Sequence, residues 1–237
     1  MAIDLGLGID TSVTPALHPQ VVASLEDYDD ETRGHLDQVV QAFTFAYENV
    51  SRVHSGREAI KTDPTLTEAA QVLRVADAAD RVFKDAAAKF DKVTANISSG
   101  IRTLEAELTT PVVARASHVI STEIRAHVKA MQGLKGIDFV RAAIERGDAD
   151  SVSAVLGAPP YLSGLTPEAQ TTLLVMWNEK SNPVAAKRLR AMKGALHLLS
   201  TNAPKLHVEL QKAIGAPAHE VAQFRAAKAR TDKAFAS

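Results

Sequence analysis

The sequence predicts an all-α protein, and three observations predict this fold class. Aromatic residues make up only 5% of the chain while alanine is frequent, and alanine favours helices and is depleted in strands. Apolar residues recur at three- and four-residue steps over long stretches, which is the spacing of one helix face. Proline and glycine separate these stretches. With 46% hydrophobic and 23% charged residues, the 237-residue chain has the composition of a folded globular protein.

Residues 1–29 are predicted to form an extended arm. The first 25 positions show no helical period and contain several residues that interrupt helices, namely Gly6, Gly8, Pro15 and Pro19. Because this stretch is moderately apolar and nearly uncharged, we expect it to dock on its own body or on a neighbour. An acidic cluster follows, and negative charge favours the start of a helix; its members are Glu26, Asp27, Asp29, Asp30 and Glu31.

Two long helices are expected next. Leu36, Phe43 and Val50 belong to an apolar stripe that predicts a helix from about Asp30 to about Lys61. The sequence Thr62-Asp63-Pro64 ends it. Thr65 and Glu68 have the spacing of a capping box, so a second helix is expected to begin there.

The second helix carries two heptad series. The first series is Ala69, Ala76, Phe83, Phe90, Ile97 and Leu104; the second is Leu66, Leu73, Asp80, Ala87, Thr94, Ile101 and Leu108. A sustained seven-residue repeat predicts a coiled-coil-like seam, roughly 65 Å long at the rise of an α-helix. Because the register continues across Gly100, a bend is favoured there over a break.

A third helix is expected after the first two, and two ways of packing it are possible. Thr110 and Pro111 are expected to end or kink the second helix, and later apolar residues predict a third: Val112, Val113, Ala116, Ile120, Ile124, Val128 and Met131. A short connection makes the first two helices an antiparallel hairpin. The third helix either completes a three-helix bundle or extends the rod. The bundle is favoured for residues 30–132, because two helices alone would leave wide apolar stripes exposed.

Residues 137–237 are expected to form a smaller multi-helix module after a linker at 133–136. Short helices are predicted at about 137–146 and 149–156, with a loop at 157–160. Thr166-Pro167 and Asn182-Pro183 each begin a further helix, the first ending near Lys180. Pro204 predicts a kink in the helix that begins at Asn182-Pro183, and residues 215–217 predict its end. A basic, alanine-rich helix is expected after it.

Charge is distributed unevenly along the chain. Residues 1–180 hold 17 Lys/Arg and 25 Asp/Glu, whereas residues 181–237 hold 10 Lys/Arg and 3 Asp/Glu. The candidate interaction residues of this basic region are Lys187, Arg188, Arg190, Lys193, Arg225, Lys228 and Arg230. They would suit an acidic protein surface or the phosphate backbone of DNA. Few aromatic residues accompany them, which disfavours stacking on single-stranded bases.

The sequence lacks the residues that several classes of functional site require. The chain has no cysteine, which excludes disulfides, thiolate metal sites and cysteine nucleophiles. No two histidines have the spacing of a helical zinc site, and no Gly-x-Ser-x-Gly elbow occurs. No apolar run approaches the length of a membrane span, so we expect a soluble protein. The sequence therefore predicts no enzyme, no cofactor and no metal site.

Three segments resemble uncharacterised helical proteins of tailed bacteriophages: 139–148 (FVRAAIERGD), 154–165 (AVLGAPPYLSGL) and 182–192 (NPVAAKRLRAM). The three segments lie within residues 139–192, which are about a quarter of the chain, and the resemblance carries over no site residue. It implies a virion component of a head, connector or tail that is assembled in the bacterial cytoplasm. The alternative location is the bacterial cytoplasm itself.

The expected function is that of a structural protein forming a homo-oligomer or binding other structural proteins. Its acidic N-terminal region and basic C-terminal region could attract head to tail. The alternative is a nucleic-acid-associated protein that uses the basic surface of residues 181–237.

Overall fold

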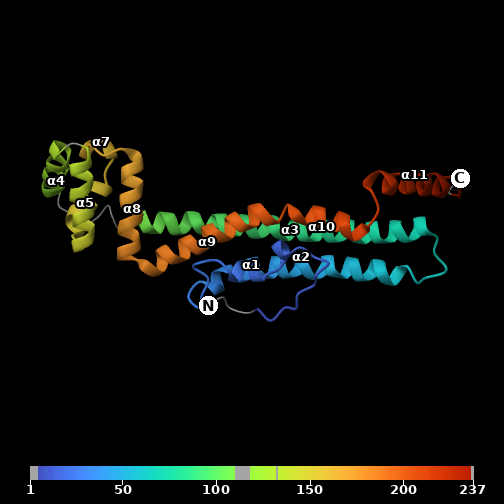
Figure 1. The fold of residues 1–237 in the computed structure, drawn as a ribbon. Coiled ribbons are helices and arrows are strands. Elements are labelled where there is room, and N and C mark those ends of the chain that lie inside the picture. The colour runs from blue at the N-terminus through green and yellow to red at the C-terminus, as the bar shows by residue number, and fades with distance from the viewer. Residues whose placement is uncertain (1–4, 110–117, 132, 236–237) are drawn as a thin grey trace. The chain divides into compact units, whose positions relative to one another are not determined.

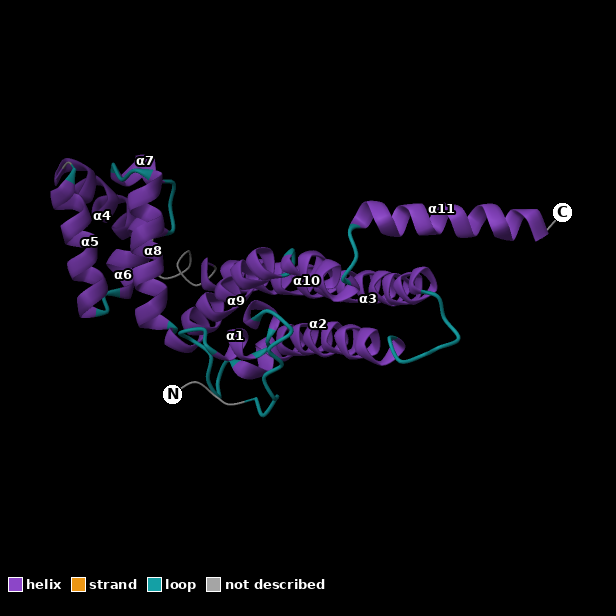
Figure 2. Cartoon of the chain, turned by 45° about the vertical axis from the view of Figure 1, so that its right-hand side comes forward, coloured by secondary structure: helices purple, strands orange, loops and turns teal. Residues whose placement is uncertain are grey.

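Every regular element in the described part of the chain is a helix (Figure 2). The structure is a computed structural model and describes residues 5–109, 118–131 and 133–235. The elements are η1 (Pro15–Leu17), α1 (Gln20–Ala23), α2 (Arg33–Ile60), α3 (Glu68–Thr109), α4 (His118–Met131), α5 (Leu134–Arg146), α6 (Ala149–Leu156), α7 (Pro160–Ser163), α8 (Pro167–Ser181), α9 (Pro183–Asn202), α10 (Lys205–Ile214) and α11 (Ala218–Phe235). The predicted all-α class is confirmed. None of these helices is both long enough and apolar enough to span a membrane.

Contacts divide the chain into two compact units with boundaries other than the predicted ones. Unit 1 consists of Met1–Ile97 and Gly194–Ser237, and unit 2 consists of Ser98–Lys193. The boundaries differ because of the way in which two helices, α4 and α10, pack. Within unit 2, helix α4 packs against α5, α6 and α7, whereas within unit 1, α10 returns to pack along α2 (Figure 1). The predicted division between 30–132 and 137–237 therefore falls inside unit 2.

The core of unit 1 is built on one face of α2. The residues buried on this face recur every three or four positions: Leu36, Val39, Ala42, Phe43, Ala46, Tyr47, Val50 and Val53. Phe43 is fully buried, and its ring meets Phe90 of α3 edge to face with centroids 5.2 Å apart. The bounds predicted for this helix agree with α2 to within a turn.

The coiled-coil seam predicted along α3 is not confirmed. Several residues of the first heptad series are buried, but Asp80 of the second series is exposed and Thr94 is only half-buried, whereas their neighbours Ala79 and Val93 are buried. Burial recurs after eighteen residues, from Val75 to Val93 and from Ala79 to Ile97. Eighteen residues are five turns of an ordinary α-helix at 3.6 residues per turn, so the buried face drifts away from a strict heptad.

The cap of α3 differs from expectation, whereas the absence of a break at Gly100 agrees with it. The helix is capped by Thr67, whose hydroxyl accepts a hydrogen bond from the Ala70 amide at 3.3 Å, whereas Thr65 bonds to Asp63. At Gly100 the helix continues without a break. A Cβ there would lie 2.5 Å from Met192 Cε, so glycine leaves the space that the methionine side chain occupies.

The predicted extended arm contains the short helices η1 and α1 and is docked on its own unit. Leu17 and Val22 are fully buried. The Thr14 amide donates a hydrogen bond to the carboxylate of Glu209 at 3.0 Å. Glu209 is itself buried on α10, and Lys212 neutralises it at 2.6 Å. The expectation that this segment docks on the body of the protein is therefore met.

Unit 2 has its own hydrophobic core. It consists of Val128, Val140, Ala143, Ile144, Val152, Val155, Leu156, Leu165 and Leu173, with Trp177 packed against it. Helices α5 and α6 confirm the two short helices that were predicted, and Thr166 caps α8 by accepting a hydrogen bond from Ala169 at 3.2 Å. The predicted linker at 133–136 is wrong: α5 begins at Leu134.

Gly136 explains the error in the linker prediction. A Cβ at this position would lie 3.2 Å from the carbonyl oxygen of Val128, so glycine serves here for the close approach of α4 and α5. The residues predicted to join α3 to the third helix, namely Thr110, Pro111, Val112, Val113 and Ala116, lie outside the described residues. Further on, the kink expected at Pro204 is instead a division between two helices, because α9 ends at Asn202 and α10 begins at Lys205.

Candidate functional site

Much of the basic stripe predicted on α9 is neutralised within the chain. Arg190 pairs with Glu179 at 2.8 Å, and Lys193 pairs with Glu105 at 2.6 Å. Lys187 is also engaged within the chain. Arg188 is half-buried, and its Nε atom is enclosed with no hydrogen-bond partner among the described residues. The stripe therefore offers less positive charge to a partner than its sequence indicates.

The three candidate interaction residues on α11 comprise one anchored residue and two exposed ones. Arg225 bonds to Asp80 at 2.5 Å and to Asp77 at 3.1 Å on α3. The hydrogen bond that Arg225 donates to Asp80, helped by the one that it donates to Asp77, raises the pKa of the Arg225 guanidinium. Lys228 and Arg230 are exposed and make no ion pair with any described residue. Asp80, expected in a seam, instead anchors α11.

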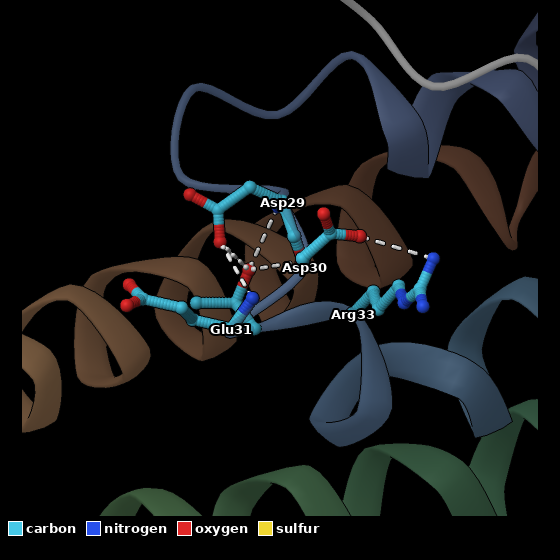
Figure 3. Close-up of polar contacts among 5 residues, drawn as sticks. Asp29, Asp30, Glu31 and Arg33 are labelled. Carbon is cyan, nitrogen blue, oxygen red and sulfur yellow. Dashed lines mark hydrogen bonds and ion pairs between the residues drawn. The ribbon is translucent and has the colours of Figure 1, made fainter.

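The acidic cluster lies at the N-terminus of α2, as its sequence position predicts. The Asp29 carboxylate accepts a hydrogen bond from the Glu31 amide at 3.0 Å, and the Thr32 hydroxyl accepts one from the Asp29 amide at 3.0 Å (Figure 3). Asp30 pairs with Arg33 at 3.1 Å. Two further acids, Glu26 and Asp27, precede this turn. We call residues 26–31, which hold five carboxylates, the acidic segment.

A basic groove between α2 and α3 was missed by the sequence analysis. It has a volume of about 460 Å³, and four arginines line it: Arg52 and Arg57 from α2, Arg74 and Arg81 from α3. Its apolar lining consists of Phe45, Val53, Ile60, Val75, Ala78 and Val82, and Asp85 is the one acidic residue that lines it. We call this feature, which lies wholly within unit 1, the arginine groove.

Helix geometry brings these arginines together. Arg74 and Arg81 are two turns apart on α3 and so share a face. Arg57 rests its guanidinium group against Gly215, where a Cβ would overlap it; Gly215 has a φ of 71°, which glycine adopts without strain. Past Arg57 the groove leads into a second hollow of about 440 Å³, which Arg57 also lines.

The arginines of the groove have acidic neighbours but few short ion pairs: Arg57 interacts electrostatically with Glu58, and Arg74 with Asp63. Arg52 approaches Glu48 only at 4.0 Å. Arg57, Arg74 and Arg81 form no hydrogen bond or ion pair with any residue that the structure describes. A sequence signal did exist, the seven-residue spacing of Arg74 and Arg81. It was obscured because residues 1–180 carry a net negative charge, which hides a local cluster of the opposite sign.

A second polar cluster holds the N-terminal segment in place. The Asp10 carboxylate accepts hydrogen bonds from the Ser12 amide at 2.8 Å and from the Ser51 hydroxyl on α2. The Tyr47 hydroxyl donates to the Asp10 carbonyl at 3.2 Å. Bonds from Ser12, then from Ser51, lower the pKa of Asp10 to about 2. A hollow of about 490 Å³ adjoins this cluster.

The bonds around Asp10 attach the N-terminal segment to α2, and His18 adds to this attachment. Buried His18 accepts a hydrogen bond from the Gln20 amide at its Nδ1 and meets the Tyr47 ring edge to face, at 4.7 Å between centroids. The Nε2 atoms of His18 and His54 are enclosed and unbonded in the part of the chain described. Neither His18 nor His54 is hydrogen-bonded to a hydroxyl group among the described residues.

Replacing Asp10 by asparagine is expected to loosen residues 5–24 and to lower the free energy of unfolding by about 1 kcal/mol, after allowance for solvent screening. In the native protein, a pKa depressed from 3.8 to about 2 stabilises the fold fully above pH 4. That contribution is lost as the pH falls from about 4 to about 2. Amide exchange of residues 5–24, measured in both proteins across this range, checks the prediction; identical exchange at pH 6 would contradict it.

No group of three or more histidine, aspartate or glutamate side chains in residues 5–109, 118–131 and 133–235 is arranged to hold a metal ion. The site that the structure assembles most clearly is therefore the arginine groove. No protein-family model matches the chain, and searches of the curated proteins and of the solved structures find no match.

Proposed function

We propose that this chain is a non-enzymatic structural protein that assembles into a homo-oligomer through contacts between helical surfaces. The observation that carries the proposal is the arginine groove. Arginine rims around apolar floors are typical of protein interfaces, where arginine is enriched and can bind a carboxylate through two parallel hydrogen bonds. Such a groove fits a protein surface better than a small polar substrate.

Nucleic acid is the less favoured partner. Three of the basic residues predicted to contact phosphates, Arg190, Lys193 and Arg225, already pair with carboxylates of the same chain. A phosphate backbone would have to displace these carboxylates. The apolar residues of the arginine groove would also stay uncovered against a phosphate backbone, which offers no apolar surface.

The setting that we propose for the oligomer is a bacteriophage virion, as a component of the head, connector or tail that is assembled in the bacterial cytoplasm. Support for this setting comes from the sequence resemblance of residues 139–148, 154–165 and 182–192. An all-helical fold with an exposed terminal helix, α11, which buries only Val221 among its described side chains, is consistent with a part that contacts neighbours.

Native mass as a function of salt tests the proposal. At low ionic strength, where charges act over about 30 Å, we expect a mass that is a multiple of 25.3 kDa. Near 1 M salt, where the screening length is about 3 Å, we expect the mass to fall towards that of one chain. Sedimentation velocity at several protein concentrations provides the measurement. A single-chain mass under all conditions would rule out the homo-oligomer.

A further inference from the structure

We propose that the arginine groove of one copy binds the acidic segment, residues 26–31, of a second copy, so that copies associate head to tail. This inference rests on the proposed function and names the surfaces that meet. Four arginines against Asp85 give the groove a clear positive charge, and five carboxylates within six residues give the segment a clear negative charge. Both surfaces belong to unit 1.

The geometry of α2 excludes pairing within one chain. The acidic segment lies directly before Arg33, where α2 begins, whereas the groove runs along α2 from Phe45 to Ile60. The nearer groove arginine of α2, Arg52, is 19 residues from Arg33, which is roughly 28 Å along a helix. The acidic segment therefore does not reach these arginines in its own chain, and a contact between the two surfaces requires a second molecule.

The two surfaces also match in chemistry. A guanidinium group accepts a carboxylate in a planar, two-bond geometry, and the exposed acids Glu26 and Asp30 present such groups. Among the residues that the structure describes, Asp30 pairs with Arg33, at an exposed site where such pairs contribute little stability. The apolar lining excludes water once a partner covers it, and the lower local dielectric strengthens each ion pair.

The geometry further defines the type of assembly. A groove at one end of a helix and its ligand at the other end form a heterologous contact, in which each copy uses both surfaces. Such contacts can close as a reciprocal pair, in which each groove holds the acidic segment of the other copy, or continue as a larger ring or a filament. The proposed contact replaces the basic region of residues 181–237 as the partner of the acidic end.

Reciprocal charge reversal tests the contact. One variant reverses the groove (R74E with R81E), and the other reverses the acidic segment (E26K with D30K). Neither pair of residues supports the fold through a buried contact, because all four are exposed. Each variant alone should self-associate at least about tenfold more weakly than the unaltered protein in sedimentation velocity at low salt. An equimolar mixture of the two should regain assembly, since each then supplies the charge that the other lacks.

A matched control changes the same amount of charge elsewhere. The variant K228E with R230E reverses two exposed cations on α11 and should assemble as the unaltered protein does. Circular dichroism verifies that every variant is folded. Assembly by the groove variant at the unaltered affinity, or two monomeric variants that do not associate when mixed, would overturn the proposed contact while leaving a homo-oligomer intact. A monomeric unaltered protein would instead defeat the proposed function itself.

Discussion

Replacing Phe43 by alanine is expected to lower the free energy of unfolding of unit 1 by about 3–5 kcal/mol. Phe43 is fully buried on α2, and its ring packs against Phe90. The substitution removes the apolar contact area and the edge-to-face contact and leaves a cavity that the surrounding helices fill only in part. Because a domain is stabilised by only about 5–15 kcal/mol, the loss is large. Urea unfolding followed by circular dichroism measures it.

Phe235→Ala is the matched control for this experiment. Phe235 is 88% exposed at the end of α11, so the same change of side chain should alter the free energy of unfolding by less than about 0.5 kcal/mol. Hydrogen exchange then locates the effect, which should appear as faster exchange in α2, α3 and α10. Equal losses for the two variants would show that Phe43 does not occupy a packed core.

Replacing Leu173 by alanine is expected to destabilise unit 2 by about 2–5 kcal/mol. Leu173 is 1% exposed and belongs to the cluster formed by α4, α5, α6 and α8. The chain has one tryptophan, Trp177, and it packs partly against this cluster. Tryptophan fluorescence therefore reports on unit 2, and its unfolding midpoint should move to lower denaturant concentration.

Leu134→Ala makes the same chemical change at a side chain that is 77% exposed, and its fluorescence midpoint should stay within error of the unaltered protein. Should Leu173→Ala leave the Trp177 transition in place, the core assigned to unit 2 would be incorrect.

Local structure was predictable from the sequence because local rules decide it. Proline, glycine and a capping threonine set the bounds of α8 and separate α9 from α10, and the stripe containing Leu36 and Phe43 identified α2. Which helix packs on which was not predictable. The stripe on α2 specifies only that an apolar partner is needed, and α10, far away in the sequence, provides it instead of α4.

The interaction surfaces were harder to predict for a related reason. Arg190 and Lys193 form a cationic stripe in the sequence, but Glu179 and Glu105, distant in the sequence, reach them only in the folded chain. The arginine groove is the opposite case, because it is not visible in the sequence and forms only in the folded chain. Its arginines are scattered among acidic residues of α2 and α3, and only the pairing of these two helices gathers them around one hollow.

The order of the units along the chain has a consequence for synthesis. Unit 1 is interrupted in sequence by unit 2, and 144 residues separate Ile60, the end of α2, from Lys205, the start of α10. At a translation rate of about 5–20 residues per second, the apolar face of α2 waits on the order of ten seconds for its partner helix to leave the ribosome. Nascent chains of this protein should therefore bind chaperones that recognise exposed apolar helices until α10 has emerged.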